Sequence, residues 1–130
     1  MAFVFDSSAV LALLLGEPEA ERVAEVLERA RDDEDEIFLP FMTLMEVRYR
    51  LLRDYPARAA VGVAIVRSWP ARIEESDPAW REAAAHVKAR GGLSLGDAWI
   101  AALALMHDAE LVHKDPEFDR VEGLRSLRLY

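Results

Sequence analysis

The sequence predicts an α/β sandwich with a mostly parallel sheet, and three observations lead to that class. Short apolar runs rich in aromatic and β-branched residues alternate with segments of helical periodicity. With 52% hydrophobic and 31% charged residues over 130 positions, the composition is that of a globular chain with one core. No repeat or Gly/Ser linker divides the sequence, so we expect one domain over 1–130. Strands that alternate with helices usually form parallel sheets.

The first half of the chain is expected to hold two strands and four helices. Residues 2–5 (AFVF) are an apolar run that ends at Asp6, which predicts a buried strand. A short helix is expected at 8–15, where Gly16 stops it. A second helix, at 18–31, has apolar residues at helical spacing and acids in its first turn. An apolar strand and two periodic helices, the last opened by a proline, are expected at 37–40, 42–53 and 56–69.

The second half continues the alternation. A short strand is expected at 71–76. It is followed by an amphipathic helix at 78–90, which the glycine pair at 91–92 closes. The segment 94–107 is apolar on nearly every side, which predicts a central and largely buried helix. Two strands complete the sheet, the second at its edge, at 110–113 and 127–130.

The net charge of −8 comes mostly from one segment. Residues 17–36 carry ten acids and three arginines, a charge of −7, on a predicted helix and the loop 32–36 that contains Asp33. The acidic balance argues against a broad nucleic-acid-binding surface but leaves room for a local basic one. The chain has no cysteine. This excludes a disulfide framework, a zinc–thiolate cluster, an iron–sulfur site and a cysteine nucleophile.

The first twenty residues lack the features of a signal peptide. The first basic residue is Arg22, and Asp6 interrupts the apolar run. The apolar stretch 9–15 is far shorter than the roughly 20 residues of a spanning helix. We therefore expect a cytoplasmic protein without a membrane partner, which the lack of disulfides also suits.

Four acidic residues lie in apolar or structured surroundings instead of on a charged face. Asp6 follows the first strand, and Glu46 lies early in a helix. Asp97 lies in the first turn of the most apolar helix, and Asp115 follows the strand at 110–113. Functional groups gather at the carboxyl ends of parallel strands, so these four carboxylates are candidates for a shared site.

Each of these acids also has a purely structural interpretation. The segments Thr43–Glu46 and Ser94–Asp97 have the spacing of a capping box. Asp115 precedes a proline, as an N-cap residue often does, and Asp6 stands at the start of a predicted helix. For any one acid alone capping is the commoner use, whereas the four together favour chemistry.

The chain resembles the PIN-domain nucleases, and specifically the VapC-type ribonuclease toxins of toxin–antitoxin pairs. The resemblance covers essentially the whole length and rests on FDSSAVLALLL, TLMEV, SLGDAWIAALAL and LVHKDPEF, the last two being the most specific. It implies a three-layer α/β/α sandwich that holds a divalent metal in an acidic pocket and cuts RNA. Residue by residue, it places the family's four acids at Asp6, Glu46, Asp97 and Asp115, with Asp119 as a substitute for the last. The HKD segment replaces the commoner Thr-x-Asp, so a threonine hydroxyl is missing there.

The chemistry of carboxylates agrees with this expectation. Four carboxylates that converge repel one another, and some take up protons unless a cation neutralises them. Mg²⁺ or Mn²⁺ prefers oxygen ligands and can activate a water for attack on a phosphodiester. We expect Asp6 and Asp97 to be direct ligands, and Glu46 and Asp115 to act partly through water.

Residues beside the acids are candidates for substrate contacts. Ser7 or Ser8 is expected to hydrogen-bond a metal-bound water or a site carboxylate, with helix capping as the alternative. Candidates for contacts to the RNA backbone are four basic residues, each of which could equally be solvated surface: Arg48, Lys88, Arg90 and Lys114.

The leading hypothesis is an Mg²⁺- or Mn²⁺-dependent endoribonuclease, the toxin of a toxin–antitoxin pair. The resemblance implies an RNA substrate, a cognate antitoxin and a homodimer. Apolar residues such as Leu11 and Leu15 could contact the antitoxin, although core packing is their commoner role. Two alternatives stay open. One is a catalytically inactive PIN-like interaction module, and the other is an RNA-processing PIN nuclease outside any such pair.

Overall fold

The structure is a computed structural model that describes residues 1–32 and 34–130. Asp33 of the acidic loop lies outside these residues. The strands are β1 (Ala2–Phe5), β2 (Glu36–Pro40), β3 (Arg72–Glu74), β4 (Glu110–His113) and β5 (Arg125–Arg128). They form one sheet in the order β3-β2-β1-β4-β5, and every neighbouring pair is parallel. The predicted α/β class is confirmed, with a sheet that is parallel throughout.

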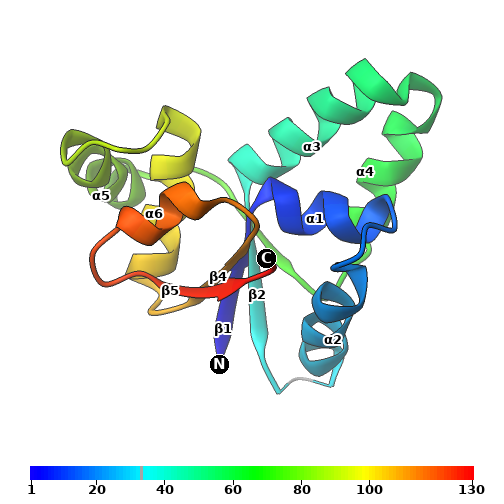
Figure 1. The fold of residues 1–130 in the computed structure, drawn as a ribbon, viewed down its shortest axis with the longest axis horizontal. Coiled ribbons are helices and arrows are strands. Elements are labelled where there is room, and N and C mark those ends of the chain that lie inside the picture. The colour runs from blue at the N-terminus through cyan, green and yellow to red at the C-terminus, as the bar shows by residue number, and fades with distance from the viewer. Residues whose placement is uncertain (33) are drawn as a thin grey trace.

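Helices cover both faces of this sheet (Figure 1). The α-helices are α1 (Ser7–Leu14), α2 (Ala20–Arg31), α3 (Phe41–Asp54), α4 (Ala59–Arg67), α5 (Pro78–Ala89) and α6 (Leu95–Met106). Short 3-10 turns form η1 (Pro56–Arg58) and η2 (Pro116–Arg120). In Figure 1, α1 to α4 lie on one side of the sheet, and α5 and α6 lie on the other. No helix in the described part of the chain is long and apolar enough to span a bilayer.

The strands divide the core into two because successive side chains point to opposite faces. Phe3 and Phe5 of β1 pack with residues of α1 to α4, whereas Val4 between them packs with residues of α5 and α6. Phe3, Val4 and Phe5 are all fully buried. A central strand covered on both faces needs a continuous apolar run, and AFVF supplies one.

The strand order places a topological switch point beside β1. From β1 the chain passes through α1 and α2 to β2 on one side, and β4, reached from α5 and α6, lies on the other. In open parallel sheets, ligand sites form beyond the carboxyl ends of the strands at such a point. Asp6 follows β1 directly, so it stands at this position.

Two predicted elements differ from the structure in an informative way. The helix expected over 56–69 begins as the 3-10 turn η1 and ends at Arg67, because Pro70 disfavours helical backbone at the residue before it. The edge strand expected at 127–130 lies at Arg125–Arg128 instead. Its residues are partly buried or exposed, so no apolar run in the sequence marks the position where the strand begins.

The capping box predicted at Thr43–Glu46 is wrong. Helix α3 begins at Phe41, after Pro40, so Thr43 lies inside the helix. Its buried hydroxyl donates instead to the carbonyl oxygen of Phe5, at 2.9 Å. This bond joins the first turn of α3 to the end of β1, immediately before Asp6.

We expect Thr43→Val to lower the free energy of unfolding by about 1–3 kcal/mol, because the carbonyl of Phe5 loses its hydroxyl donor in a buried place. Urea unfolding followed by circular dichroism measures the change. The matched control is Ser68→Ala, which removes an exposed hydroxyl that donates to the carbonyl of Ile65. It should change stability by less than about 0.5 kcal/mol. Equal stability of Thr43→Val and the wild type would contradict the role given to this bond.

Candidate metal centre

The four acids predicted from the sequence lie at the carboxyl edge of the sheet. Asp6 follows β1 and caps α1, and Glu46 lies in the second turn of α3. Asp97 lies in the first turn of α6, and Asp115 follows β4 as the cap of η2. Burial raises the pKa values of Asp6 and Asp97, and the charges of neighbouring acids of the set add to both shifts, so the four carboxyl groups share one electrostatic environment.

Asp6 is almost completely buried, with 4% of its surface exposed. Its Oδ1 accepts two hydrogen bonds, from the hydroxyl of Ser8 at 2.6 Å and from the backbone N–H of Ala9 at 3.0 Å. Asp6 is therefore a helix cap as well as a candidate ligand. Both of these bonds fall on one carboxylate oxygen, so the two roles are compatible.

Burial raises the pKa of Asp6 from 3.8 to about 7. The hydrogen bonds from Ser8 and Ala9 oppose this shift, while the nearby charges of Asp97 and Glu46 add to it. A carboxyl group with this pKa exchanges its proton near neutral pH. It carries a large fraction of neutral form unless a cation stabilises its charge.

Glu46 is held by a serine from another element. The hydroxyl of Ser7, which is buried, donates to Oε2 of Glu46 at 2.6 Å. This contact joins the first residue of α1 to the second turn of α3. Of the two roles predicted for Ser7, the structure thus shows a hydrogen bond to a site carboxylate.

Asp97 and Asp115 form the most compact part of the site together with Glu117. One carboxylate oxygen from each of the three lies within 4.8 Å of the other two. Burial, followed by the charge of Asp115, raises the pKa of Asp97 to about 6. The charges of Glu46 and Glu117 add to this rise, while a hydrogen bond with Ser94 opposes it. Three such oxygens match the ligand chemistry of a hard divalent cation.

Glu117 is not among the residues predicted from the sequence. It is exposed and lies two residues after Asp115, in a turn whose backbone N–H donates to Oδ1 of Asp115 at 2.9 Å. The sequence feature that could have indicated Glu117 is the proline after Asp115, because a tight turn at this proline places residue 117 close to Asp115.

Asp119, the substitute considered for the fourth acid, has other partners. Its carboxylate accepts from Nε of Arg128 at 2.7 Å and from the hydroxyl of Tyr130 at 2.9 Å. These bonds lower the pKa of Asp119. Asp115 is the residue that the structure brings to Asp97.

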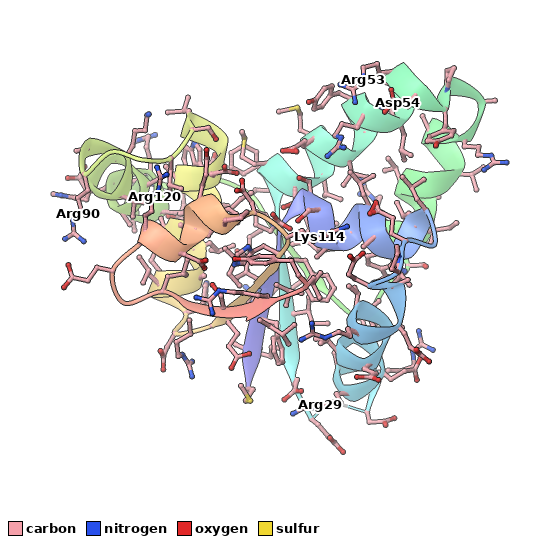
Figure 2. The ribbon with its side chains drawn as sticks, in the orientation of Figure 1. Arg29, Arg53, Asp54, Arg90, Lys114 and Arg120 are labelled. Carbon is pink, nitrogen blue, oxygen red and sulfur yellow. The ribbon has the colours of Figure 1, made fainter. Side chains whose placement is uncertain are left out.

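The basic residues predicted to contact the RNA backbone do not gather at the acid site as the four acids do. Arg48 lies exposed on α3, two residues after Glu46, and Arg90 lies at the outer end of α5, well away from Lys114 (Figure 2). The amine of Lys88 donates to the backbone carbonyl of Leu93 at 2.8 Å.

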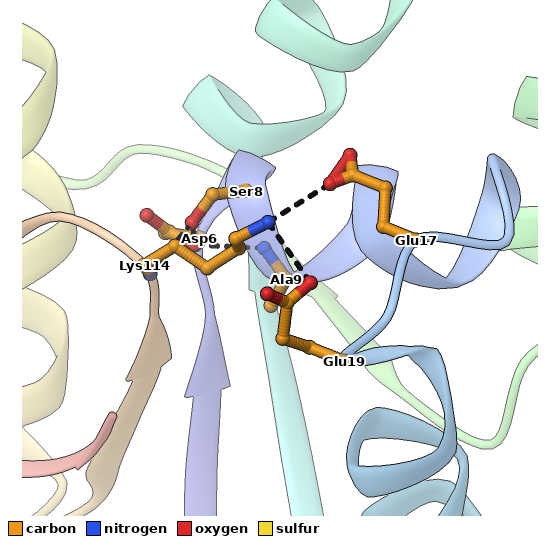
Figure 3. Close-up of polar contacts among 6 residues, drawn as sticks. All are labelled: Asp6, Ser8, Ala9, Glu17, Glu19 and Lys114. Atoms are coloured by element: carbon orange, nitrogen blue, oxygen red, sulfur yellow. Dashed lines mark hydrogen bonds and ion pairs between the residues drawn. The ribbon is translucent and has the colours of Figure 1, made fainter. Parts of the chain in front are cut away.

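The amine of Lys114 is also engaged. It lies 2.9 Å from a carboxylate oxygen of Glu17 and 3.0 Å from one of Glu19 (Figure 3). This pairing raises the pKa of Lys114 and lowers that of Glu19. The structure therefore turns this amine toward the α1–α2 connection.

A family comparison matches residues 3–124 to the PIN domain. The chain belongs to the PIN-domain family. The predicted resemblance is thereby confirmed at the level of family. The matched segment contains all the acids of the site, and it runs from β1 through β4 to the residue before β5.

Solved structures agree with this PIN-domain fold. VapBC2 from Rickettsia felis, bound to a promoter DNA fragment, is similar with a TM-score of 0.81 at 18% identity, covering 98% of each chain. DNA-bound VapBC from Salmonella typhimurium gives 0.80 at 21% identity, covering 100% of this chain and 99% of that one. Mycobacterium tuberculosis VapC20, described as a sarcin–ricin loop cleaving toxin, gives 0.75 at 22%, covering 98% and 99%. No curated protein sequence matches the chain significantly. At these identities the likeness concerns the fold.

In this PIN domain the raised pKa values make stability depend on pH. Between about pH 4 and 7 the folded state holds protons on Asp6 and Asp97 that the unfolded state has lost. The free energy of unfolding should therefore fall as the pH rises through this range. We expect a fall of at least about 1 kcal/mol, since one unit of pKa difference corresponds to about 1.4 kcal/mol.

Urea unfolding in EDTA at several pH values between 4 and 8 measures this effect. Asp6→Asn removes the titrating group but keeps the cap, so its stability should depend less on pH than that of the wild type. Asp77→Asn alters the cap of α5, where Oδ1 accepts from the N–H of Trp80, and should keep the wild-type dependence. Parallel profiles for Asp6→Asn and the wild type would refute the assignment.

Proposed function

We propose that this PIN domain is an Mg²⁺- or Mn²⁺-dependent endoribonuclease, the toxin of a toxin–antitoxin pair. The observation that carries the proposal is the gathering of acids from four separate segments at the sheet's switch point. Two of them, Asp6 and Asp97, have pKa values raised toward neutrality. Helix capping accounts for contacts of single acids, but it does not require them to lie where their charges repel.

The acids present fit a divalent cation. Asp97, Asp115 and Glu117 offer three oxygens within 4.8 Å of one another. Asp6 and Glu46 belong to the same site, because the charge of Glu46 acts on both Asp6 and Asp97. Burial, with the charges of neighbouring acids added to it, raises the pKa values of Asp6 and Asp97. A bound divalent cation would lower both pKa values, because its charge stabilises the ionised carboxylates. Mg²⁺ or Mn²⁺ prefers such oxygen ligands.

Each part of the chain has a separate task in the proposed reaction. A bound divalent cation would supply water activation and would stabilise the charge that develops on the phosphodiester. Ser7 keeps Glu46 oriented, and Ser8 keeps Asp6 oriented, so these carboxylates need not reorganise during the reaction. Arg48, exposed near Glu46, is available to the RNA backbone.

The charge of the site supports a requirement for metal in RNA binding as well as in hydrolysis. RNA brings its negative phosphates toward several carboxylates, which repel them. Neutralisation of the acids removes that repulsion, so phosphate approach and cation binding are coupled. RNA as the substrate is supported by the likeness in fold to a toxin described as cleaving the sarcin–ricin loop.

The antitoxin partner is supported by an apolar groove at the far end of α1. The groove has a volume of about 290 Å³, and Leu14, Leu51 and Val61 are among the residues that line it. Leu15 lines it too and is 40% exposed, whereas Leu11 is buried in the core and unavailable. A solved structure of similar fold, from Klebsiella pneumoniae, is described as a toxin–antitoxin complex. We assign the groove to an antitoxin segment that continues along α1 toward the acids.

Two further parts of the proposal concern assembly and location. Met45, Tyr49 and Leu52 recur at helical spacing on α3 and are each about half exposed. We assign this apolar stripe to a second copy of the chain in a homodimer. The cysteine-free composition suits the reducing cytoplasm.

Asp97→Asn separates catalysis from capping. The change keeps the shape of the side chain and removes its charge, so RNA cleavage should fall roughly 10²-fold or more. Melting in EDTA should stay unchanged or rise slightly, because repulsion from Asp115 is relieved. Cleavage of a labelled RNA with Mg²⁺ or Mn²⁺, and its loss in excess EDTA, are the measurements.

The matched control is Asp77→Asn, at a helix cap on α5 that has no part in the acid site. It should cleave RNA as the wild type does. Wild-type cleavage by Asp97→Asn, or by the native protein in EDTA, would end the metal-dependent proposal. A native protein that binds Mn²⁺ but cuts no RNA would favour the inactive interaction module.

The fourth acid is tested by metal binding without RNA. Mn²⁺ should raise the melting temperature of the wild type, since it binds the folded state. Asp115→Asn and Glu117→Gln should each reduce this rise, because each removes a charged ligand. Asp119→Asn should leave the rise intact, since Asp119 is bonded to Arg128 and Tyr130. The opposite ranking would assign the fourth ligand to Asp119.

A further inference from the structure

Lys114 connects two segments that lie far apart in the sequence. Its amine bonds to Glu17 at 2.9 Å and to Glu19 at 3.0 Å, both near the connection between α1 and α2 (Figure 3). Its backbone N–H donates to Oγ of Ser8 at 2.9 Å. Lys114 thus fixes the end of β4 against both ends of α1.

The contact with Ser8 continues to Asp6. The hydroxyl of Ser8 accepts from the backbone of Lys114 and donates to Oδ1 of Asp6 at 2.6 Å. The next residue, Asp115, is held as well, because its N–H donates to Nδ1 of the buried His113 at 3.1 Å. The turn that carries Asp115 and Glu117 is therefore fastened on its N-terminal side.

This fastening opposes a repulsive force. Asp97, Asp115 and Glu117 place like charges within 4.8 Å of one another before any cation binds. Glu117 is exposed and η2 is a short turn, so relaxation of the turn outward would relieve the repulsion. The ion pairs of Lys114 are only partly exposed, with 27% of the lysine side chain accessible, and two acids share the amine. Such a network resists displacement better than a single surface pair.

We propose that Lys114 is a positioning residue for the metal centre. Through Glu17 and Glu19 it anchors the β4–η2 turn, so that Asp115 and Glu117 meet Asp97 in the arrangement that binds a divalent cation. The proposal rests on the metal-binding part of the proposed function. It replaces the expectation that Lys114 contacts the RNA backbone, because the anchoring role commits the amine to two carboxylates.

The effect of Lys114 on cation affinity has a sign that separates position from charge. Removal of a positive charge beside the site makes the local potential more negative, which by itself tightens cation binding. Loss of an anchor weakens binding, because the ligands must be gathered against their repulsion. Residues that orient metal ligands typically change metal affinity 10–100-fold when they are mutated.

The experiment measures Mn²⁺ binding by calorimetry, without RNA, for Lys114→Gln, Lys114→Arg and the double variant Glu17→Gln/Glu19→Gln. We expect Lys114→Gln and the double variant to raise the Kd for Mn²⁺ about 10-fold. Lys114→Arg should restore much of the affinity. The triple variant should be no weaker than Lys114→Gln, because both changes break the same anchor.

The matched control is Arg53→Gln. It breaks an ion pair with Asp54 at the far end of α3 from Lys114 (Figure 2) and should leave the Kd unchanged. Unchanged melting in EDTA for all variants establishes that they are folded. Tighter or unchanged Mn²⁺ binding by Lys114→Gln overturns the proposal, and so does an absence of Mn²⁺ binding by the wild type.

RNA kinetics at saturating metal distinguish the anchor from a substrate contact. An RNA contact predicts that Lys114→Gln raises KM, while the double variant, which frees the amine, does not. The anchor predicts that both variants regain near-native kcat and KM once Mn²⁺ is saturating. A raised KM for Lys114→Gln alone overturns the proposal. Wild-type protein that shows the Mn²⁺ effects but cuts no RNA leaves the anchor standing and refutes the nuclease.

Discussion

The burial of a carboxyl group at the end of the central strand is the constraint on which the rest of the site depends. Asp6 must follow β1 closely to reach the switch point, and β1 is covered on both faces, so its surroundings are apolar. A charge in that place is costly, which is why its pKa rises to about 7. The neighbouring acids increase this cost. The fold therefore has to hold together groups that repel one another.

Small polar contacts from α1 and α3 meet that requirement. Ser7 and Ser8, adjacent on α1, bond respectively to Glu46 and Asp6, and Thr43 bonds to the backbone just before Asp6. Helix α1 lies between the acids at one end and the apolar groove at the other. One short helix thus belongs to both the acid site and the groove proposed for the antitoxin.

Much of this arrangement was predictable from local sequence. AFVF followed by Asp6 indicates a buried strand with an acid at its carboxyl end, and the order of elements then places the site. The acid at 97 stood out because the helix around it is otherwise apolar. These inferences depend on residues that are close in the chain, where periodicity and capping rules apply.

The features that local sequence patterns did not reveal depend on contacts between distant segments. Glu117 resembles any exposed acid until the η2 turn places it beside Asp97, a contact that local patterns do not encode. Thr43 has the spacing of a cap, but its partner is the carbonyl of Phe5. Lys114 is predicted from the sequence as a candidate RNA contact, and the sequence does not reveal its partners in the structure, Glu17 and Glu19, which lie almost a hundred residues earlier.

The parallel strand order also sets when the site can exist during synthesis. Strand β1 is made first, yet its neighbour β4 comes from residues 110–113, and the acids at 115 and 117 follow still later. Chains emerge from the ribosome with the N-terminal end first. A nascent chain therefore carries Asp6 and Glu46 long before it carries the acids that complete the cluster. Because of this topology, the acid cluster cannot assemble in a growing chain until residue 117 has been translated.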